Sequence, residues 1–263
     1  VLLECQRIPS PAAPGGTAAS LNRLREILDA DASRIAALVV EPMVQGAAGM
    51  QTYDADFLAG ARRLCDEFDV FLICDEVFTG YGRTGPMWAC QHANVAPDIV
   101  CTAKGFSGGM LPMAATLTTE RIFEGFLGEP SRAFYYGHTF CGNPLGAAVA
   151  LEVLQVFEDE DILGAAKEKS VRIANAFEEM ASWPGVSRNR ALGMVGACDL
   201  DGDSGYLADA GWRVFEKARQ RGAYLRPLGN VVYVTPSLNI PDADLAELLE
   251  ILMESVSQVV GAS

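Results

Sequence analysis

Two residues of opposite charge follow apolar segments of this chain, and their types could support covalent chemistry on a cofactor. Asp75 comes directly after the apolar run at residues 70–74, and Lys104, which has small neighbours and little room as a solvated surface lysine, follows the run at residues 99–102. A carboxylate at the end of a buried strand must be paired or hydrogen-bonded. The two side chains could form a plain buried ion pair. Alternatively, both could face pyridoxal phosphate, which needs an amine for a Schiff base and a carboxylate that keeps its ring nitrogen protonated.

The segments around these residues predict an α/β fold with a mostly parallel sheet. Strands are predicted at residues 35–40, 70–74, 99–102 and 114–118, and amphipathic helices at 20–29 and 54–68, the second capped by Asp54. The continuous apolar runs indicate strands that are buried on both faces. In such sheets ligands bind at the carboxyl ends of the strands, where Glu41, Asp75 and Lys104 all fall.

The C-terminal part of the chain has a different pattern. Helices are predicted at residues 142–157, 163–180, 207–221 and 242–259, and short strands at 194–200, 223–225 and 231–234. The change follows a Trp-Pro-Gly turn signal at residues 183–185. We therefore expect a large domain over residues 1–182 and a smaller α+β domain over residues 183–263.

Composition excludes several classes of partner. The net charge of −14 disfavours nucleic acid and anionic membranes, because a polyanion would be repelled, and it serves solubility. Seven cysteines, an odd number without a Cys-x-x-Cys pair, indicate reduced thiols in a cytoplasmic protein, and with two histidines no metal site is expected. No apolar run approaches the roughly 20 residues of a membrane span, and no signal peptide is expected.

Four longer motifs carry a resemblance to a known family. In chain order they are Glu41-Pro-Met-Val-Gln-Gly-Ala-Ala-Gly-Met, Asp75-Glu-Val-Phe-Thr-Gly-Tyr-Gly-Arg-Thr-Gly, Ala96-Pro-Asp-Ile-Val-Cys-Thr-Ala-Lys-Gly and Gly137-His-Thr-Phe-Cys-Gly-Asn-Pro-Leu. They resemble the signature blocks of class III aminotransferases, which are pyridoxal-phosphate enzymes of fold type I. Asp75 and Lys104 stand 29 positions apart, which matches the family's arrangement. The resemblance implies that residues 1–182 hold only the C-terminal part of the large domain.

The resemblance also implies roles for single residues in the cofactor site. Lys104 resembles the lysine that forms the Schiff base and carries the proton between the substrate carbon and the cofactor. Asp75 resembles the partner of the pyridine nitrogen. Val77 resembles the aliphatic residue that packs on the cofactor ring, although an ordinary core valine would leave the same pattern.

A second group of residues implies a homodimer with shared active sites. His138 and Thr139 resemble the pair that reaches the phosphate of the neighbouring subunit's cofactor. Gly137 resembles a residue close to the substrate. His138 could instead be a catalytic base, but Lys104 already supplies that function, so we interpret His138 as a positional residue.

Other motifs narrow the substrate. Gln45-Gly46 is followed by Ala47, where many glutamate-using members carry glutamate, and Phe78 stands where a glutamine is usual. The block Tyr224-Leu-Arg-Pro-Leu-Gly-Asn-Val-Val-Tyr-Val-Thr-Pro resembles the branch of the family that serves biotin synthesis. In that branch the residue at Arg226 binds the distal carboxylate of the substrate, for which a planar guanidinium is well suited. A surface arginine at a strand end is the alternative.

The expected activity is transfer of an amino group from S-adenosylmethionine, or from lysine, to 8-amino-7-oxononanoate. An ω-amino-acid or diamine:pyruvate transaminase is an alternative within the family. A non-catalytic fragment or pseudoenzyme is an alternative of another class, because the chain starts without methionine and begins part-way along the family's length. The sequence has neither a Walker motif around Lys104 nor a Gly-x-Ser-x-Gly elbow, so neither a P-loop enzyme nor a hydrolase is supported.

Overall fold

The computed structural model describes residues 4–202 and 209–261. The chain divides into two compact units, which are described one at a time. The first unit comprises residues 1–43, 53–81 and 88–156, and the second comprises residues 44–52, 82–87 and 157–263. Helix α5 belongs to the second unit, whereas the sequence placed it before the boundary at 182/183; that division into domains stays a prediction.

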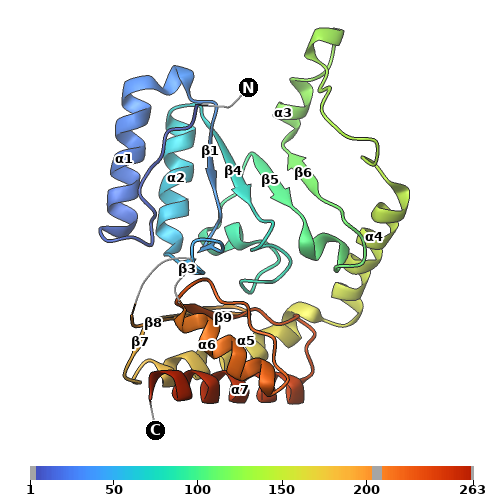
Figure 1. Ribbon diagram of the computed structural model, residues 1–263. Coiled ribbons are helices and arrows are strands. Elements are labelled where there is room, and N and C mark those ends of the chain that lie inside the picture. The colour runs from blue at the N-terminus through green and yellow to red at the C-terminus, as the bar shows by residue number, and fades with distance from the viewer. Residues whose placement is uncertain (1–3, 203–208, 262–263) are drawn as a thin grey trace. The chain divides into compact units, whose positions relative to one another are not determined.

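A four-stranded sheet forms the centre of the first unit. Its strands are β1 (Ala37–Val40), β4 (Phe71–Asp75), β5 (Ile99–Thr102) and β6 (Ala115–Thr118), and they lie in the order β1-β4-β5-β6 (Figure 1). β1, β4 and β5 are parallel, and β6 is antiparallel to β5. The predicted α/β class with a mostly parallel sheet is confirmed.

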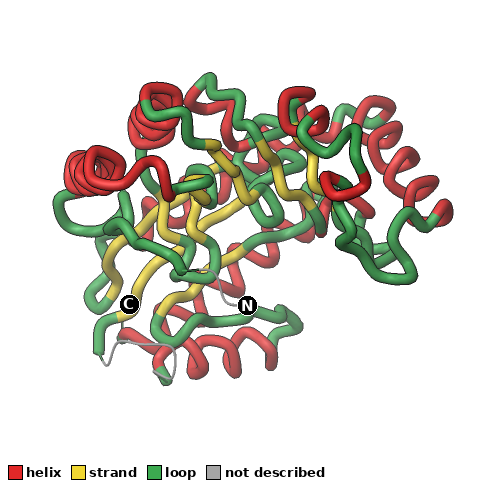
Figure 2. The backbone as a smooth tube through the Cα atoms, turned by 90° about the horizontal axis from the view of Figure 1, so that it is seen from above, coloured by secondary structure: helices red, strands yellow, loops and turns green. Residues whose placement is uncertain are grey.

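Two long helices pack together in this unit, and α2 contacts β4. They are α1 (Gly16–Asp31), followed by η1 (Ala32–Arg34), and α2 (Ala55–Glu67); Figure 2 shows both helices nearly end-on. Asp54 occupies the N-cap position of α2, although its side chain makes no capping hydrogen bond. Leu72 and Cys74 of β4 are buried, whereas Asp75 is half-buried. Since successive strand residues point to opposite faces, Asp75 lies on the face opposite the one these helices cover.

The predicted burial of the strands on both faces is wrong. Val39 in β1 is 61% exposed, and Leu117 in β6 is also exposed. Both residues belong to the outer strands of the four-stranded sheet. An apolar run shows which side chains a strand contains but not what packs against them. The pattern therefore could not distinguish a partly exposed outer strand from a buried central one.

Short helices and one long helix complete the first unit. They are η2 (Ala89–Ala93), η3 (Lys104–Ser107), α3 (Glu120–Glu124), η4 (Pro130–Arg132) and α4 (Pro144–Asp159), the last of which continues into residues of the second unit. Among the residues that the structure describes, no helix is both long and apolar enough to cross a bilayer.

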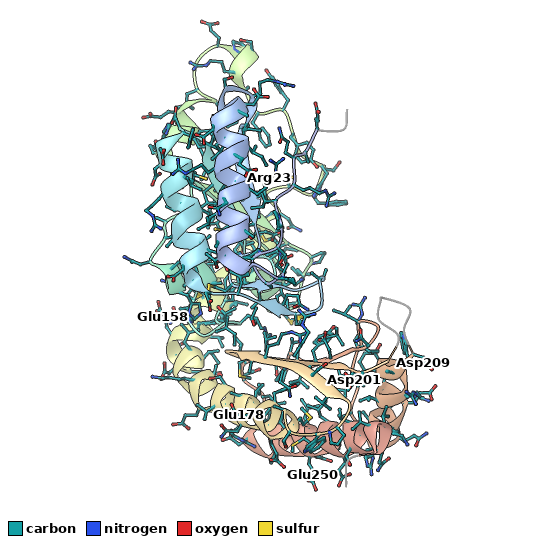
Figure 3. All side chains as sticks on the ribbon, turned by 90° about the vertical axis from the view of Figure 1, so that its left-hand side faces the viewer. Arg23, Glu158, Glu178, Asp201, Asp209 and Glu250 are labelled. Atoms are coloured by element: carbon teal, nitrogen blue, oxygen red, sulfur yellow. The ribbon has the colours of Figure 1, made fainter. Side chains whose placement is uncertain are left out.

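The second unit is an α+β structure. Its antiparallel sheet has the order β7-β8-β9, with β7 (Val186–Leu192), β8 (Val195–Leu200) and β9 (Val231–Val234). Its helices are α5 (Ile162–Met180), α6 (Ala210–Gln220) and α7 (Asp242–Val260), and β2 (Val44–Gln45) pairs with β3 (Gln51–Thr52). All six residues of β8 are buried, and Cys198 and Leu200 belong to a hydrophobic core shared with the three helices. Exposed carboxylates cover the outside of this unit, among them Glu158, Glu178, Asp201, Asp209 and Glu250 (Figure 3).

Two predictions for this unit differ from the structure. Residues 223–225 were expected to form a strand, but they lie in a loop before the Leu228–Val231 bridge. Strand β7 was not predicted, because its polar residues hide the pattern. The predicted helix at 207–221 begins within residues 203–208, which lie outside the described part of the chain.

Candidate active site

Asp75 and Lys104 lie at the carboxyl ends of two neighbouring parallel strands. Asp75 is the last residue of β4 and pairs with Cys101 of β5, three residues before Lys104. The Asp75 Oδ1 atom accepts a hydrogen bond from the Val77 amide at 3.1 Å. Val77 is half-buried, and no contact in the described residues shows it packed on a ring. Glu41 follows β1 at the same edge of the sheet, because Val40 pairs with Cys74.

The two charged groups do not form an ion pair in the described part of the chain. Lys104 is exposed, so the expectation that it has little room is wrong. Its backbone has a positive φ of 49°, which turns the chain out of the line of β5. The Nζ atom lies 5.4 Å from the centre of the Phe78 ring, a cation–π contact. The Lys104 amine is therefore free of a carboxylate partner within the described residues.

The backbone that carries Lys104 is fixed by a close contact with an aromatic residue. A Cβ atom on Gly105 would lie 2.8 Å from the Cβ atom of Tyr81, so only glycine fits. Tyr81 is buried and packs its ring against Trp88, with 5.0 Å between ring centres. Burial raises the pKa of Tyr81, and the nearby Thr102 side chain opposes that rise. Tyr81 was not predicted as a site residue; the small residue after Lys104 was the available signal for its contact.

Buried thiols surround this strand end without offering a competing nucleophile. Burial raises the pKa of the Cys74 thiol far above its usual range. Burial, with the nearby Glu76 carboxylate as a smaller cause, raises the pKa of Cys90 to about 12. None of the seven cysteines, all of which lie in the described residues, forms a disulfide; four are buried, and Cys5 and Cys141 are exposed. A thiol is nucleophilic as the thiolate, so the buried ones are inert at neutral pH.

The predicted phosphate-binding segment is exposed and is held by local contacts. The His138 amide donates to the Cys141 Sγ atom at 3.2 Å, and the Phe140 amide donates to His138 Nδ1 at 3.1 Å. Gly137 and Thr139 are exposed as well. No contact within the described residues links this segment to Asp75 or Lys104.

Arg226 belongs to the second unit, where its side chain is exposed. Its neighbours Leu225 and Pro227 are buried. A Cβ atom on Gly211 of α6 would lie 2.6 Å from Pro227 Cβ, so the helix packs tightly against this segment. Arg226 makes no ion pair within the described residues, and its guanidinium is available to a ligand.

Ala47 lies at the exposed tip of the turn between β2 and β3. Arg190 fixes this turn from β7: its Nε atom donates to the Met50 carbonyl at 2.8 Å, and its Nη2 atom donates to the Gly49 carbonyl. The same guanidinium pairs with Asp199 at 2.7 Å. Gly49 has a φ of +99°, which favours glycine. Arg190 was not predicted, because nothing in its local sequence connects it with a turn 140 residues away.

Similarity to known proteins identifies the family. The family model "Aminotransferase class-III" matches residues 7–256. This chain belongs to the class III aminotransferases. The family is pyridoxal-phosphate-dependent, as the Asp75 and Lys104 motifs predicted.

Relatives of this class III aminotransferase include enzymes of one named activity. It is 39% identical to the adenosylmethionine-8-amino-7-oxononanoate aminotransferase of Geobacter sulfurreducens, over 98% of this chain and 59% of that protein. It is also 39% identical to the protein of that name from Nitratidesulfovibrio vulgaris, over 97% of this chain and 49% of the other. The chain therefore spans about half to three-fifths of the length of these curated relatives.

Solved structures of class III aminotransferases match the fold. The crystal structure of the adenosylmethionine-8-amino-7-oxononanoate aminotransferase from Methanocaldococcus jannaschii superposes with a TM-score of 0.86 and 35% identity, over 91% of this chain and 57% of that one. An amine transaminase from an uncultivated Pseudomonas species, in its PLP-bound (internal aldimine) form, superposes with a TM-score of 0.86 and 33% identity, over 92% of this chain and 57% of that one.

The residues of this class III aminotransferase fit the cofactor of its family. Asp75 uses one carboxylate oxygen for the Val77 amide and leaves Oδ2 for a protonated ring nitrogen. Lys104 supplies an exposed amine without a carboxylate partner in the described residues.

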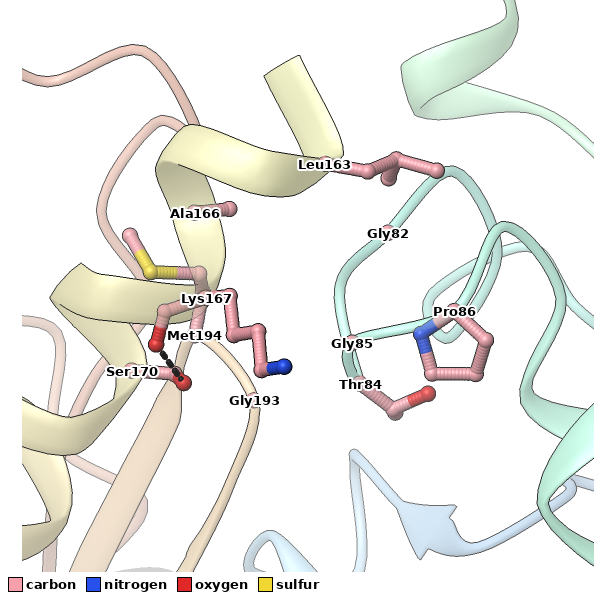
Figure 4. A pocket seen from close by; sticks show the side chains of 10 residues that line it. All are labelled: Gly82, Thr84, Gly85, Pro86, Leu163, Ala166, Lys167, Ser170, Gly193 and Met194. Carbon is pink, nitrogen blue, oxygen red and sulfur yellow. Dashed lines mark hydrogen bonds between the residues drawn. The ribbon is translucent and has the colours of Figure 1, made fainter. Parts of the chain in front are cut away.

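A separate pocket of about 320 Å³ lies within the second unit and contains none of the predicted site residues. It is lined by Gly82, Thr84, Gly85, Pro86, Leu163, Ala166, Lys167, Ser170, Gly193 and Met194 (Figure 4). Lys167 is the only charged residue in this lining. The Ser170 hydroxyl donates a hydrogen bond to the Lys167 backbone carbonyl at 2.6 Å. Three glycines and a proline leave few groups for chemistry, so we do not assign this pocket as the active site.

Proposed function

We propose that the protein containing this chain is a pyridoxal-phosphate-dependent aminotransferase that aminates 8-amino-7-oxononanoate in biotin synthesis. The observation that carries the proposal is the placement of Asp75 and Lys104, unpaired with each other, at adjoining ends of β4 and β5. Identity of 39% to curated enzymes of that name supports the substrate. Their name also supports S-adenosylmethionine as the amino donor, with lysine as the alternative. A cytoplasmic location remains part of the proposal.

In this mechanism Lys104 holds the cofactor and moves a proton. When bound, pyridoxal phosphate supplies an electron sink for the carbanion that forms at the substrate carbon. The Lys104 Nζ atom would take the proton from that carbon and carry it between the substrate carbon and the cofactor. An amine that is not locked in an ion pair can do this without first breaking a strong contact.

Asp75 would keep the ring nitrogen protonated with the carboxylate oxygen that the Val77 amide does not bind, since that amide donates to Oδ1. A fixed carboxylate of this kind needs no reorganisation when charge develops on the ring. Val77 would pack its side chain on the ring, a role that its half-buried position allows.

Arg226 and Ala47 would select the substrate. The exposed guanidinium of Arg226 offers a two-point grip for the distal carboxylate of 8-amino-7-oxononanoate. At Ala47 no carboxylate is present to pair with an arginine, which disfavours a glutamate-using enzyme.

A homodimer with shared sites is also part of the proposal. His138 and Thr139 would contact the phosphate in the neighbouring subunit, and Gly137 would lie close to the substrate there. The surrounding large apolar side chains are exposed, with Tyr136 at 85%. They are Phe134, Tyr135, Tyr136 and Phe140. Exposed apolar groups that gather in one segment mark an interaction surface.

Two alternatives remain. Similarity to the Pseudomonas amine transaminase favours an ω-amino-acid or diamine:pyruvate transaminase. A non-catalytic fragment or pseudoenzyme is the alternative of another class. Against that alternative, Lys104, Asp75, Thr139 and Arg226 are all present.

Single-turnover spectroscopy of the complete protein tests the proposal. Borohydride should fix the cofactor covalently on Lys104, as located by peptide mass spectrometry. S-Adenosylmethionine should then convert the cofactor to its amine form, and 8-amino-7-oxononanoate should reverse the change. If pyruvate reverses it and the oxononanoate does not, the ω-transaminase alternative is correct. Absence of any adduct would support the non-catalytic alternative.

A further inference from the structure

We propose that Glu76, the residue after Asp75, is a positioning residue that holds the cofactor-facing turn at residues 75–80; this inference rests on the proposed function. The Glu76 side chain is fully buried. Its Oε2 atom accepts hydrogen bonds from the Thr79 hydroxyl at 2.6 Å and from the Ala89 amide at 3.0 Å. Its Oε1 atom accepts from the Cys90 amide at 2.9 Å. A buried carboxylate with three donors and no cation, within the described residues, is held entirely by neutral groups.

The backbone of Glu76 ties the same turn to the sheet. Its amide donates to the Cys101 carbonyl of β5 at 2.9 Å, and its carbonyl accepts from the Gly80 amide at 3.0 Å. A Cβ atom on Gly80 would lie 2.9 Å from the Glu76 carbonyl oxygen and 2.9 Å from the Trp88 ring. Glu76 therefore joins the cofactor-facing turn at residues 75–80, to which it belongs, to two other parts of the unit. These are strand β5 and the first turn of η2.

The residues inside this turn are those that face Lys104 and Asp75. Phe78 places its ring 5.4 Å from the Lys104 Nζ atom, and the Val77 amide binds the Asp75 carboxylate. Glu76 follows the last residue of β4 and is fully buried, whereas Asp75 is half-buried. Glu76 thus acts through its neighbours and does not touch the cofactor.

The three donors require a carboxylate rather than an amide. An ionised glutamate accepts hydrogen bonds at both oxygens, whereas glutamine presents an NH₂ group on one side. In Glu76→Gln that NH₂ group would face an amide N–H, either of Ala89 or of Cys90. One buried donor would then be left without an acceptor, which is costly.

The test compares four variants in the complete protein. Glu76→Gln removes the carboxylate, and Thr79→Val removes one donor but keeps the side-chain shape. Thr79→Ser keeps the hydroxyl. Gln91→Ala is the matched control. Gln91 Oε1 accepts a hydrogen bond from the Trp88 amide at 2.9 Å at the start of η2, but Gln91 is exposed. Amide hydrogen exchange of residues 76–90, the cofactor dissociation constant and the pH midpoint of the bound cofactor's absorption are measured.

We expect graded effects. Glu76→Gln should raise exchange in residues 76–90, weaken cofactor binding about tenfold or more and shift the absorption midpoint. Thr79→Val should act in the same direction by roughly threefold, while Thr79→Ser should behave like wild type. Gln91→Ala should match wild type in the dissociation constant and the absorption midpoint, with faster exchange confined to the Trp88 amide. Should Glu76→Gln fail to fold, the Thr79 pair decides, since both variants keep the carboxylate.

Failure of this inference is distinguishable from failure of the proposed function. A wild type that shows no borohydride-fixed cofactor on Lys104 refutes the proposed function, and with it the role of Glu76 toward the cofactor. If the cofactor binds, raised exchange with an unchanged dissociation constant and midpoint would make Glu76 merely structural and overturn the proposal. Equal behaviour of Thr79→Val and Thr79→Ser would also overturn it.

Discussion

The Asp75 strand end and the His138 segment are built in different ways, although both are predicted to contact pyridoxal phosphate, Asp75 in its own subunit and His138 in the neighbouring one. Asp75 lies in a sheet and beside a buried network that involves Glu76 and the first turn of η2. His138 and Thr139 are exposed, and within the described residues the hydrogen bonds of His138 go only to Phe140 and Cys141. The first region is held by buried contacts within its own unit. The second is exposed and rich in aromatic side chains, and in the proposed homodimer a partner would cover it.

The largest expected effect belongs to Lys104. Lys104→Ala should lower kcat by at least about 10²–10⁴-fold, because it removes both the covalent attachment and the proton carrier. Borohydride reduction followed by mass spectrometry should find no labelled peptide. Lys167→Ala, which removes another exposed lysine, should behave like wild type. A reducible adduct that persists in Lys104→Ala would show that another amine holds the cofactor.

Asp75→Asn should keep the cofactor bound but lower kcat by roughly hundredfold, because an unprotonated ring nitrogen is a poor electron sink. The absorption spectrum and stopped-flow rates of each half-reaction measure both effects. Asp56→Asn, an exposed carboxylate in the first turn of α2, is the control. Activity near wild type in Asp75→Asn would mean that the rigid strand end has another role.

The fold was predictable where residue type and spacing carry the information. The strand at Ile99–Thr102 and helix α7 follow from an apolar run and a helical period, and both are confirmed. Exposure of Val39 and the existence of β7 were not predictable, since both depend on what lies beside the strand. β7 contains Arg188 and Arg190, whose charges obscure the alternation.

The site was predictable to a similar extent. Asp75 and Lys104 stand out by type and by their position after apolar runs. Glu76 and Tyr81 did not, because their contacts join segments that are separate in sequence: Glu76 reaches residue 90, and Tyr81 packs against Gly105. A sequence shows which residues can do chemistry more readily than which residues hold them in place.

Arg226 tests whether an exposed group can nevertheless be specific. Arg226→Ala should lower the specificity constant for 8-amino-7-oxononanoate by about one to two decades, the size of a lost charge-assisted contact. The half-reaction with the amino donor should change less. Arg226→Lys should recover only part of the loss, because an ammonium lacks the planar fork. Arg213→Ala on α6 is the control. Equal damage to both half-reactions would assign Arg226 to the fold or to both substrates.

The smallest expected effect, at Thr139, most directly separates the two regions. Thr139→Ala should weaken cofactor binding by about two- to tenfold, since it removes one hydroxyl contact, and Thr139→Ser should restore it. If the Thr139 contact crosses the dimer interface, Thr139→Ala weakens cofactor binding in the partner's site. Hybrids of Lys104→Ala and Thr139→Ala protomers then contain one site with both Lys104 and an intact Thr139. Fluorescence titration of purified hybrids should find that site with wild-type affinity, whereas the Thr139→Ala homodimer stays weak. Weak binding in the hybrid would place Thr139 in the site of its own chain, and the exposed segment would then need no partner to complete it.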